Sequence, residues 1–182
     1  EIGGTLVPLS ANPIDAIWHD RPAPPLEPVS IQNIEHAGQL AKDKISAMAK
    51  TIASDKAALC VLTDPSSVAW VFNIRGNDVP HTPLPLSFAI LKAEGEPLLF
   101  IDKRKLPIKT EAYLNQLCAL MPPSALEEEL SKLAANGTAV SLDPVLAADQ
   151  LRRIVDKAGG KVVEATDPAR LPRARKNKIE LD

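Results

Sequence analysis

Short apolar runs alternate with segments of helical pattern along most of this chain, and this alternation restricts the fold more than any other feature. The expected strands are residues 57–62, 86–91, 97–101, 116–120, 138–142 and 161–165. Helices are expected between them, at residues 38–54, 64–73, 107–115, 124–136 and 147–158. Strands that alternate with helices of this length form layered structures. The sequence therefore predicts an α/β fold, with one antiparallel hairpin at residues 86–101.

Turn and capping residues mark the ends of these elements. Asp64-Pro65 supplies an N-cap followed by proline at the first helical position, where a missing N–H costs nothing. Ser124 and Glu127 have the spacing of a capping box, and Asn136-Gly137 suits the left-handed end of the same helix. These signals predict where three helix ends lie.

Proline placement divides the chain further. Five of the 17 prolines fall between Pro13 and Pro28, and Arg21-Pro22-Ala23-Pro24-Pro25 can form neither a helix nor a central strand. We therefore expect an extended strap and linker over residues 1–36.

Composition excludes several classes of partner. With 182 residues the chain can bury the core of one domain, and its net charge of −2 gives no general attraction to nucleic acid or anionic membranes. The one basic run, residues 170–178, is interpreted as a solvated terminal or interdomain segment. No apolar run approaches the ~18 residues of a membrane span. Cys60 and Cys118 lie in apolar runs and are expected to be buried free thiols, which favours the cytoplasm.

Catalytic and metal-binding patterns are missing from the sequence. There is no G-x-G-x-x-G motif and no phosphate-binding lysine loop. The histidines His19, His36 and His81 are far apart, and Asp78 with His81 is the one pair that could share an ion. Ser66 and Ser67 could act with His81 as nucleophiles, but serine in the first turn of a helix ordinarily stabilises that end. We therefore expect neither a catalytic residue nor a metal site in this chain.

Residues 69–83 form the candidate functional segment, because Arg75, Asp78 and His81 lie within seven residues of a proline-stiffened loop between apolar flanks. A structural interpretation has Arg75 bonding carbonyls at a helix end, Asp78 forming a turn, and His81 packing against Trp70 or the strap. A functional interpretation has Arg75 and His81 projecting toward a ligand or partner. Spacing alone leaves both open, whereas Trp70 is expected in the core.

Three segments resemble one peptidase family. Asp64-Pro65-Ser66-Ser67-Val68-Ala69-Trp70, followed by residues 73–83, is similar to the second domain of three-domain Xaa-Pro aminopeptidases. Residues 12–18 with Arg21-Pro22 resemble that family's link out of its first domain, and residues 171–180 resemble the join to its catalytic domain. The resemblance covers nearly the whole chain, in order.

This resemblance implies a creatinase/prolidase N-terminal-type domain, a three-layer α/β/α structure around a mixed sheet of about five or six strands. The domain would occupy residues 37–170, and residues 171–182 would lead to the catalytic domain. In that family a pita-bread catalytic domain holds two divalent metals, usually manganese, with two Asp, one His and two Glu. None of these ligands is present, so the resemblance implies a non-catalytic piece of a larger metallopeptidase, and the non-methionine start fits a piece.

The resemblance also implies roles for the loop. Arg75 and His81 would lie on the rim of a site for peptides with proline second, with Asp78 holding one of them and Asn73 in the same substrate-access or domain-contact segment. The implied partners are the missing catalytic and first domains and a second copy of a homodimeric cytoplasmic parent. Two alternatives stay open: a free-standing α/β binding module without peptidase activity, and an independent small hydrolase.

Overall fold

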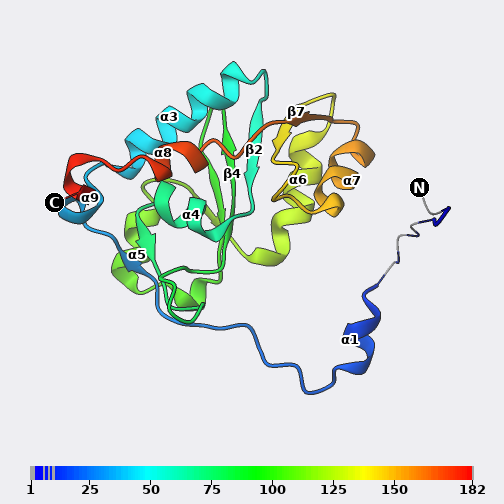
Figure 1. Ribbon diagram of the computed structural model, residues 1–182, viewed down its shortest axis with the longest axis horizontal. Coiled ribbons are helices and arrows are strands. Elements are labelled where there is room, and N and C mark those ends of the chain that lie inside the picture. The colour runs from blue at the N-terminus through cyan, green and yellow to red at the C-terminus, as the bar shows by residue number, and fades with distance from the viewer. Residues whose placement is uncertain (1–2, 6, 8, 10, 182) are drawn as a thin grey trace.

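A six-stranded mixed sheet lies at the centre of the computed structural model, which describes residues 3–5, 7, 9 and 11–181 (Figure 1). The strand order is β6-β5-β4-β2-β7-β8. The strands are β2 (Leu59–Leu62), β4 (Phe88–Lys92), β5 (Leu98–Phe100), β6 (Ala119–Met121), β7 (Ala139–Leu142) and β8 (Lys161–Glu164).

Strand directions confirm the predicted hairpin. Strands β2, β7 and β8 are parallel to one another, whereas β4 is antiparallel to both of its neighbours, β2 and β5. The β4–β5 turn contains Gly95 at φ +94°, a conformation that glycine adopts without steric cost. Strand β6 returns parallel to β5 after a helix. The sheet is therefore mixed, as the resemblance implied.

Helices cover both faces of the sheet. On one face lie α3 (Ala41–Ser54), α4 (Pro65–Val71) and α5 (Ile108–Leu114), and on the other α6 (Leu126–Ala134) and α7 (Asp149–Lys157). Cys60 and Leu62 of β2 join the first core, whereas Leu59 and Val61 join the second, because successive side chains of a strand point to opposite faces. The predicted three-layer α/β/α structure is confirmed.

Shorter elements complete the described chain. They are α1 (Pro13–Ile17), β1 (Ser30–Ile31), α2 (Ile34–Ala37), β3 (Ile74–Arg75), η1 (Lys103–Lys105), η2 (Pro123–Ala125), α8 (Arg170–Ala174) and α9 (Lys178–Leu181). Strands β1 and β3 form a separate antiparallel pair. Arg75 therefore belongs to a short strand, not to the loop that the sequence predicted from that residue onward.

The predicted helix ends are partly confirmed. The Asp64 carboxylate accepts a bond from the Ser66 N–H at 2.8 Å, and Asn136 and Gly137 have positive φ after α6. The capping box at Ser124 is wrong. Pro122-Pro123 starts the 3₁₀ turn η2, so Ser124 lies inside that turn and α6 begins without a side-chain cap. Three glutamates in the first turn of α6 complement the helix dipole instead.

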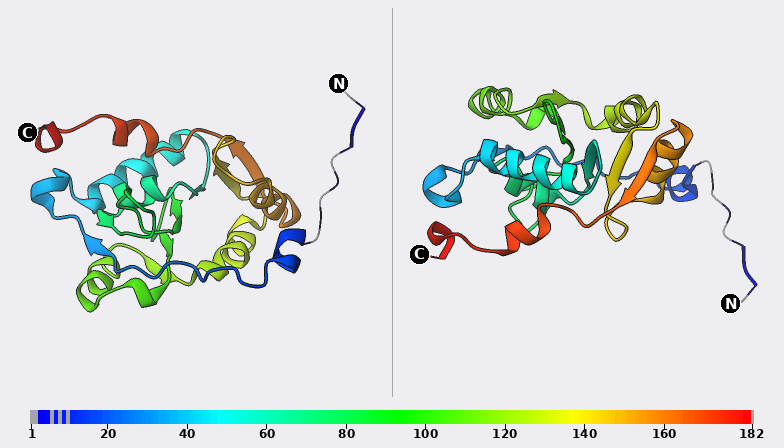
Figure 2. Two further views of the ribbon diagram at one scale, coloured as in Figure 1. Left: turned by 60° about the horizontal axis from the view of Figure 1, so that its bottom comes forward. Right: turned by 90° about the horizontal axis from the view of Figure 1, so that it is seen from above.

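The strap is extended but contains a helix that the sequence analysis missed. Asn12 accepts a bond from the Ile14 N–H at 3.0 Å, and Pro13 occupies the first turn of α1. This is the same signal as Asp64-Pro65. Residues 18–28 run along one side of the body without joining a sheet (Figure 2), and Val29 is the first buried residue after them.

Both cysteines are free and buried, as expected. Burial raises the pKa of the Cys60 and Cys118 thiols to about 12. Among the described residues, no helix combines the length and apolarity that crossing a bilayer would require.

The two proline-linked caps give a stability prediction. Asp64→Ala should lower the free energy of unfolding by about 1 kcal/mol, because it removes the cap of a helix packed in the core. Asn12→Ala removes the same kind of cap from α1, which has no buried residue, and should leave global stability unchanged. Urea titrations of the two variants measure the difference. Equal losses would contradict this account.

Candidate functional site

The candidate segment begins in the core. Trp70 and Phe72 are buried at and beyond the end of α4, which confirms the expected core position of Trp70. Asn73 then turns the chain with φ +51°, and β3 follows. The segment is therefore anchored before it reaches the surface.

Arg75 is half-buried and caps the end of α4. Its Nη1 donates to the Ala69 carbonyl at 3.3 Å and to the Ile74 carbonyl at 2.8 Å. Burial lowers the pKa of the guanidinium, and the Glu180 carboxylate opposes this change. The contact that the structural interpretation predicted is thus present. Among the described residues, neither Nε nor Nη2 of Arg75 has a hydrogen-bond partner, which leaves one side of its planar fork free to bind an anion or carbonyl.

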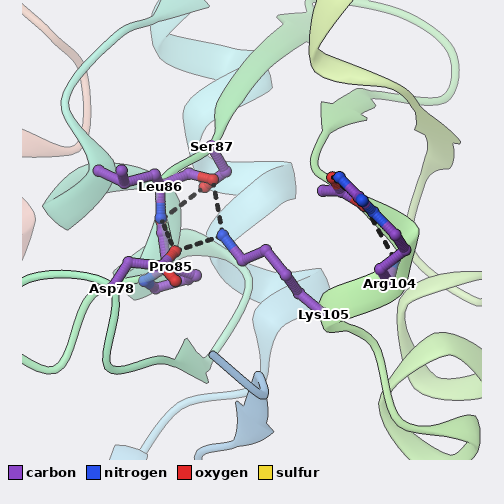
Figure 3. A network of polar contacts seen from close by, with 7 residues as sticks. Asp78, Pro85, Leu86, Ser87, Arg104 and Lys105 are labelled. Carbon is purple, nitrogen blue, oxygen red and sulfur yellow. Dashed lines mark hydrogen bonds and ion pairs between the residues drawn. The ribbon is translucent and has the colours of Figure 1, made fainter. Parts of the chain in front are cut away.

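Asp78 does not hold Arg75 or His81, and that expectation is wrong. Its buried carboxylate pairs with the buried ammonium group of Lys105 and accepts a bond from the Leu86 N–H at 2.6 Å (Figure 3). Lys105 also donates to the Leu86 carbonyl at 3.1 Å. The physical reason is that the loop folds back on itself, so that Asp78 faces the returning arm. The pair fixes the base of the loop.

His81 lies at the exposed tip of a tight turn. The Thr82 N–H donates to the Val79 carbonyl at 3.1 Å, Pro80 occupies the second position, and His81 has φ +60°. This is the pattern of a type II turn, in which glycine is the usual third residue. A histidine there costs on the order of 1 kcal/mol in backbone strain. His81 is exposed, which does not fit the packing against Trp70 or the strap in the structural interpretation.

Asn73 is separate from the exposed part of the loop. It is 4% exposed, its Nδ2 donates to the Gln39 carbonyl at 2.8 Å, and its Oδ1 accepts from Lys44 Nζ at 2.7 Å. Asn73 is therefore a buried turn residue, and direct contact with a substrate or another domain does not fit this position.

The sequence analysis missed two buried lysines, Lys44 and Lys105. Lys44 donates to the Trp70 carbonyl at 3.0 Å, and its Nζ lies 4.2 Å from the centre of the Trp70 ring. Burial lowers the pKa of Lys44 to about 8. One signal was available for Lys44, because it precedes Met48 and Ile52 by four and eight residues and so shares their buried helical stripe. Lys105 had no such signal.

Among the described residues, no group of three or more His, Cys, Asp or Glu side chains converges in a way that could hold a metal ion. A cavity of about 1020 Å³ lies between the strap and the body. Five prolines and the side chains of Leu26, Leu86 and Phe88 contribute to its lining. Arg21, Asp102, Lys103 and Lys105 also line it, so the cavity combines apolar surface with charged groups.

The buried pair at the loop base gives a second prediction. Asp78→Asn should destabilise the domain by about 3–5 kcal/mol, because it leaves the Lys105 charge buried without its counter-charge. Adding Lys105→Met to this variant removes that charge and should restore part of the loss. Urea unfolding midpoints test both. A double variant less stable than Asp78→Asn alone would contradict the assignment.

Comparison with known proteins identifies the family to which this domain belongs. The family described as Creatinase/Prolidase N-terminal domain matches residues 20–180. A probable Xaa-Pro aminopeptidase P from Leptosphaeria maculans is 31% identical over 99% of this chain, and one from Coccidioides posadasii is 33% identical over the whole chain. The chain spans 31% of the length of each of these relatives.

Solved structures of related proteins have the same fold as this chain. An X-prolyl aminopeptidase from Caenorhabditis elegans, described as a cytosolic enzyme with a di-nuclear active site, superposes with a TM-score of 0.85 at 26% identity. The match covers 96% of this chain and 29% of that one. The N-terminal domain of the Mycobacterium tuberculosis peptidase PepQ matches 71% of this chain and 98% of its own at a TM-score of 0.53 and 10% identity, which supports the fold alone. The chain belongs to the creatinase/prolidase N-terminal domain family, and the curated relatives named above are described as probable Xaa-Pro aminopeptidases P.

Proposed function

We propose that this chain is a non-catalytic domain of a Xaa-Pro aminopeptidase that shapes substrate access, with the loop from Arg75 to Pro83 facing the peptide. Residues 1–36 would link it to a first domain, residues 37–170 would form the access domain, and residues 171–182 would lead to the catalytic domain. That further domain would hold two divalent metals, manganese being our choice. The parent would be a cytoplasmic homodimer.

One observation carries the proposal: His81 keeps a strained left-handed conformation at the exposed tip of a rigidly anchored turn. In an exposed turn with this φ, histidine is strained whereas glycine is not. Backbone strain concentrates at functional sites, where the surrounding structure maintains it. Here the buried Asp78–Lys105 pair supplies that support at the base of the loop.

The chemistry of the substrate fits such a loop. A proline amide has no N–H, and its ring fixes the local backbone direction, so an enzyme must recognise it by shape and through neighbouring groups. The free side of the Arg75 guanidinium can bind a peptide carbonyl or carboxylate by charge-assisted hydrogen bonds. His81 would narrow the entrance at the tip.

Substitution of the two side chains in the complete peptidase tests this proposal. Arg75→Ala and His81→Ala should each lower kcat/KM for Xaa-Pro peptides by about tenfold or more, the cost of one hydrogen bond to a charged group. Metal content should stay near that of the wild type in both variants. Thermal stability should be unchanged in His81→Ala and modestly lower in Arg75→Ala, which also loses the carbonyl contacts at the end of α4. His36→Ala, which alters an exposed histidine on α2, is the matched control. Wild-type kinetics with peptides of several lengths would remove the access role.

Replacing the strained residue by glycine separates function from folding. His81→Gly should stabilise the domain by up to about 1 kcal/mol while lowering peptidase activity as His81→Ala does. Asn136→Gly relieves the same backbone conformation at φ +59° after α6 and should stabilise without affecting kinetics. Thermal unfolding and peptide assays on both variants provide the comparison. Undiminished activity of His81→Gly would count against the loop's role.

The alternative, a free-standing binding module without peptidase activity, predicts a different outcome. Arg75→Ala would then weaken only the cap at the end of α4, and stability would fall with no kinetic counterpart.

A further inference from the structure

Lys44 and Arg75 both donate hydrogen bonds to carbonyls at the C-terminal end of α4. Among the described residues, no carboxylate is in direct contact with either of these cations. Lys44 donates to the Trp70 carbonyl at 3.0 Å, and Arg75 donates to the Ala69 carbonyl at 3.3 Å. Carbonyls in the last turn of a helix carry partial negative charge, so cations are favoured there. Lys44 and Arg75 therefore act on adjacent peptide groups of one helix end.

Lys44 also holds the turn that leads to Arg75. Its Nζ bonds the side-chain oxygen of Asn73 at 2.7 Å, and Asn73 Nδ2 bonds the Gln39 carbonyl at 2.8 Å. Asn73 is in the left-handed conformation that turns α4 into β3, two residues before Arg75. The direction in which β3 leaves α4 thus depends on contacts made by the Lys44 ammonium group.

The anion that faces this cation pair comes from the C-terminal segment. Glu180 of α9 favours the charged forms of both Lys44 and Arg75, whereas Arg75 and Lys176 disfavour the charged form of Lys44. Asn177 fixes α9 in place by donating from Nδ2 to the Ala37 carbonyl at 2.9 Å and by exchanging hydrogen bonds with Glu180. The charged groups around Lys44 therefore come from two segments, Arg75 from β3 and the others from the C-terminal segment.

We propose that Lys44 is a positioning residue for Arg75: its ammonium group fixes the α4–β3 turn and thereby the direction of the guanidinium toward substrate. This inference rests on the proposed function of the loop. Lys44 itself would not touch the substrate. The direction of the Arg75 side chain would depend on the charge of Lys44.

Charge dependence follows from the burial of Lys44. Its lowered pKa, about 8, means that the group is mostly protonated at pH 7 and half deprotonated near pH 8. A neutral amine forms weaker hydrogen bonds to carbonyl oxygens than an ammonium does. Lysines in water titrate near pH 10.4, so an exposed lysine stays largely charged at pH 8. The effect of Lys44 should therefore fade as the pH rises through about 8.

The test compares Lys44→Met with the wild type in the complete peptidase between pH 6.5 and 9.5. At pH 7 the variant should raise KM about tenfold with little change in kcat, because Arg75 would contribute to substrate binding. The ratio of wild-type to variant kcat/KM should fall toward one as Lys44 of the wild type deprotonates. Lys50→Met, an exposed lysine of the same helix, is the control and should give a ratio near one throughout.

A double-variant cycle shows whether Lys44 acts through Arg75. In the Arg75→Ala background, Lys44→Met should have no further effect on kcat/KM. Equal effects in both backgrounds, or a ratio independent of pH, would overturn the inference. If Arg75→Ala itself changes nothing, the proposed function fails; if it lowers kcat/KM while Lys44→Met does not, only the positioning role fails.

Asn73→Asp provides a second test of the role of the Lys44 charge if the Lys44→Met variant does not fold. The new carboxylate would lie beside Nζ and should hold the charge of Lys44 to higher pH, because an opposite charge favours the ionised form. The variant also loses the hydrogen bond from Asn73 Nδ2 to the Gln39 carbonyl, so its pH profile, and not its absolute kcat/KM, is the measurement. The alkaline loss of kcat/KM should then move upward by about one pH unit or more. A pH profile that coincides with that of the wild type would contradict the role of Lys44.

Discussion

Burial of both faces of the central sheet is the constraint on which the other features depend. All four residues of β2 are buried, so this strand offers no polar group to a binding site. Acidic residues lie instead one to three residues after the parallel strands β2, β7 and β8, where Asp64, Asp143 and Asp167 accept bonds from backbone N–H groups. Functional side chains are therefore expected outside this sheet, on the segments that connect its elements.

Two buried lysines connect the candidate loop to this core. Lys44 bonds Asn73 where the segment leaves α4, and Lys105 pairs with Asp78 where it returns toward β4. The two environments differ, because Lys105 has a carboxylate partner whereas Lys44 has carbonyl and amide oxygens and the Trp70 ring. Burial lowers the pKa of Lys44, which has no carboxylate in direct contact. The exposed turn at His81 is thus rigid because both of its ends are fixed inside the protein.

Much of the fold could be predicted from local pattern. The strands, the hairpin and the Asp64 cap depend on residues close together in the sequence, and they are confirmed. The β1–β3 pairing could not be found in this way, because each strand has two residues and the partners lie more than 40 positions apart. The capping box predicted at Ser124 is wrong for another reason. Ser124 and Glu127 have the correct spacing, but Pro122-Pro123 starts a 3₁₀ turn that places Ser124 inside the turn.

The sequence by itself determined the α/β class, the likeness to Xaa-Pro aminopeptidases and the proline-stiffened turn that carries His81, since each depends on local pattern. The tertiary structure alone decided which charged groups meet. Asp78 pairs with Lys105, 27 positions away, and not with the nearer Arg75 or His81. Asn73 binds Lys44 in the core instead of joining the exposed loop. A buried polar group needs a hydrogen-bond or ion-pair partner, and tertiary packing decides which residue lies close enough to serve. The distance between two side chains in the fold cannot be read from their separation in the sequence.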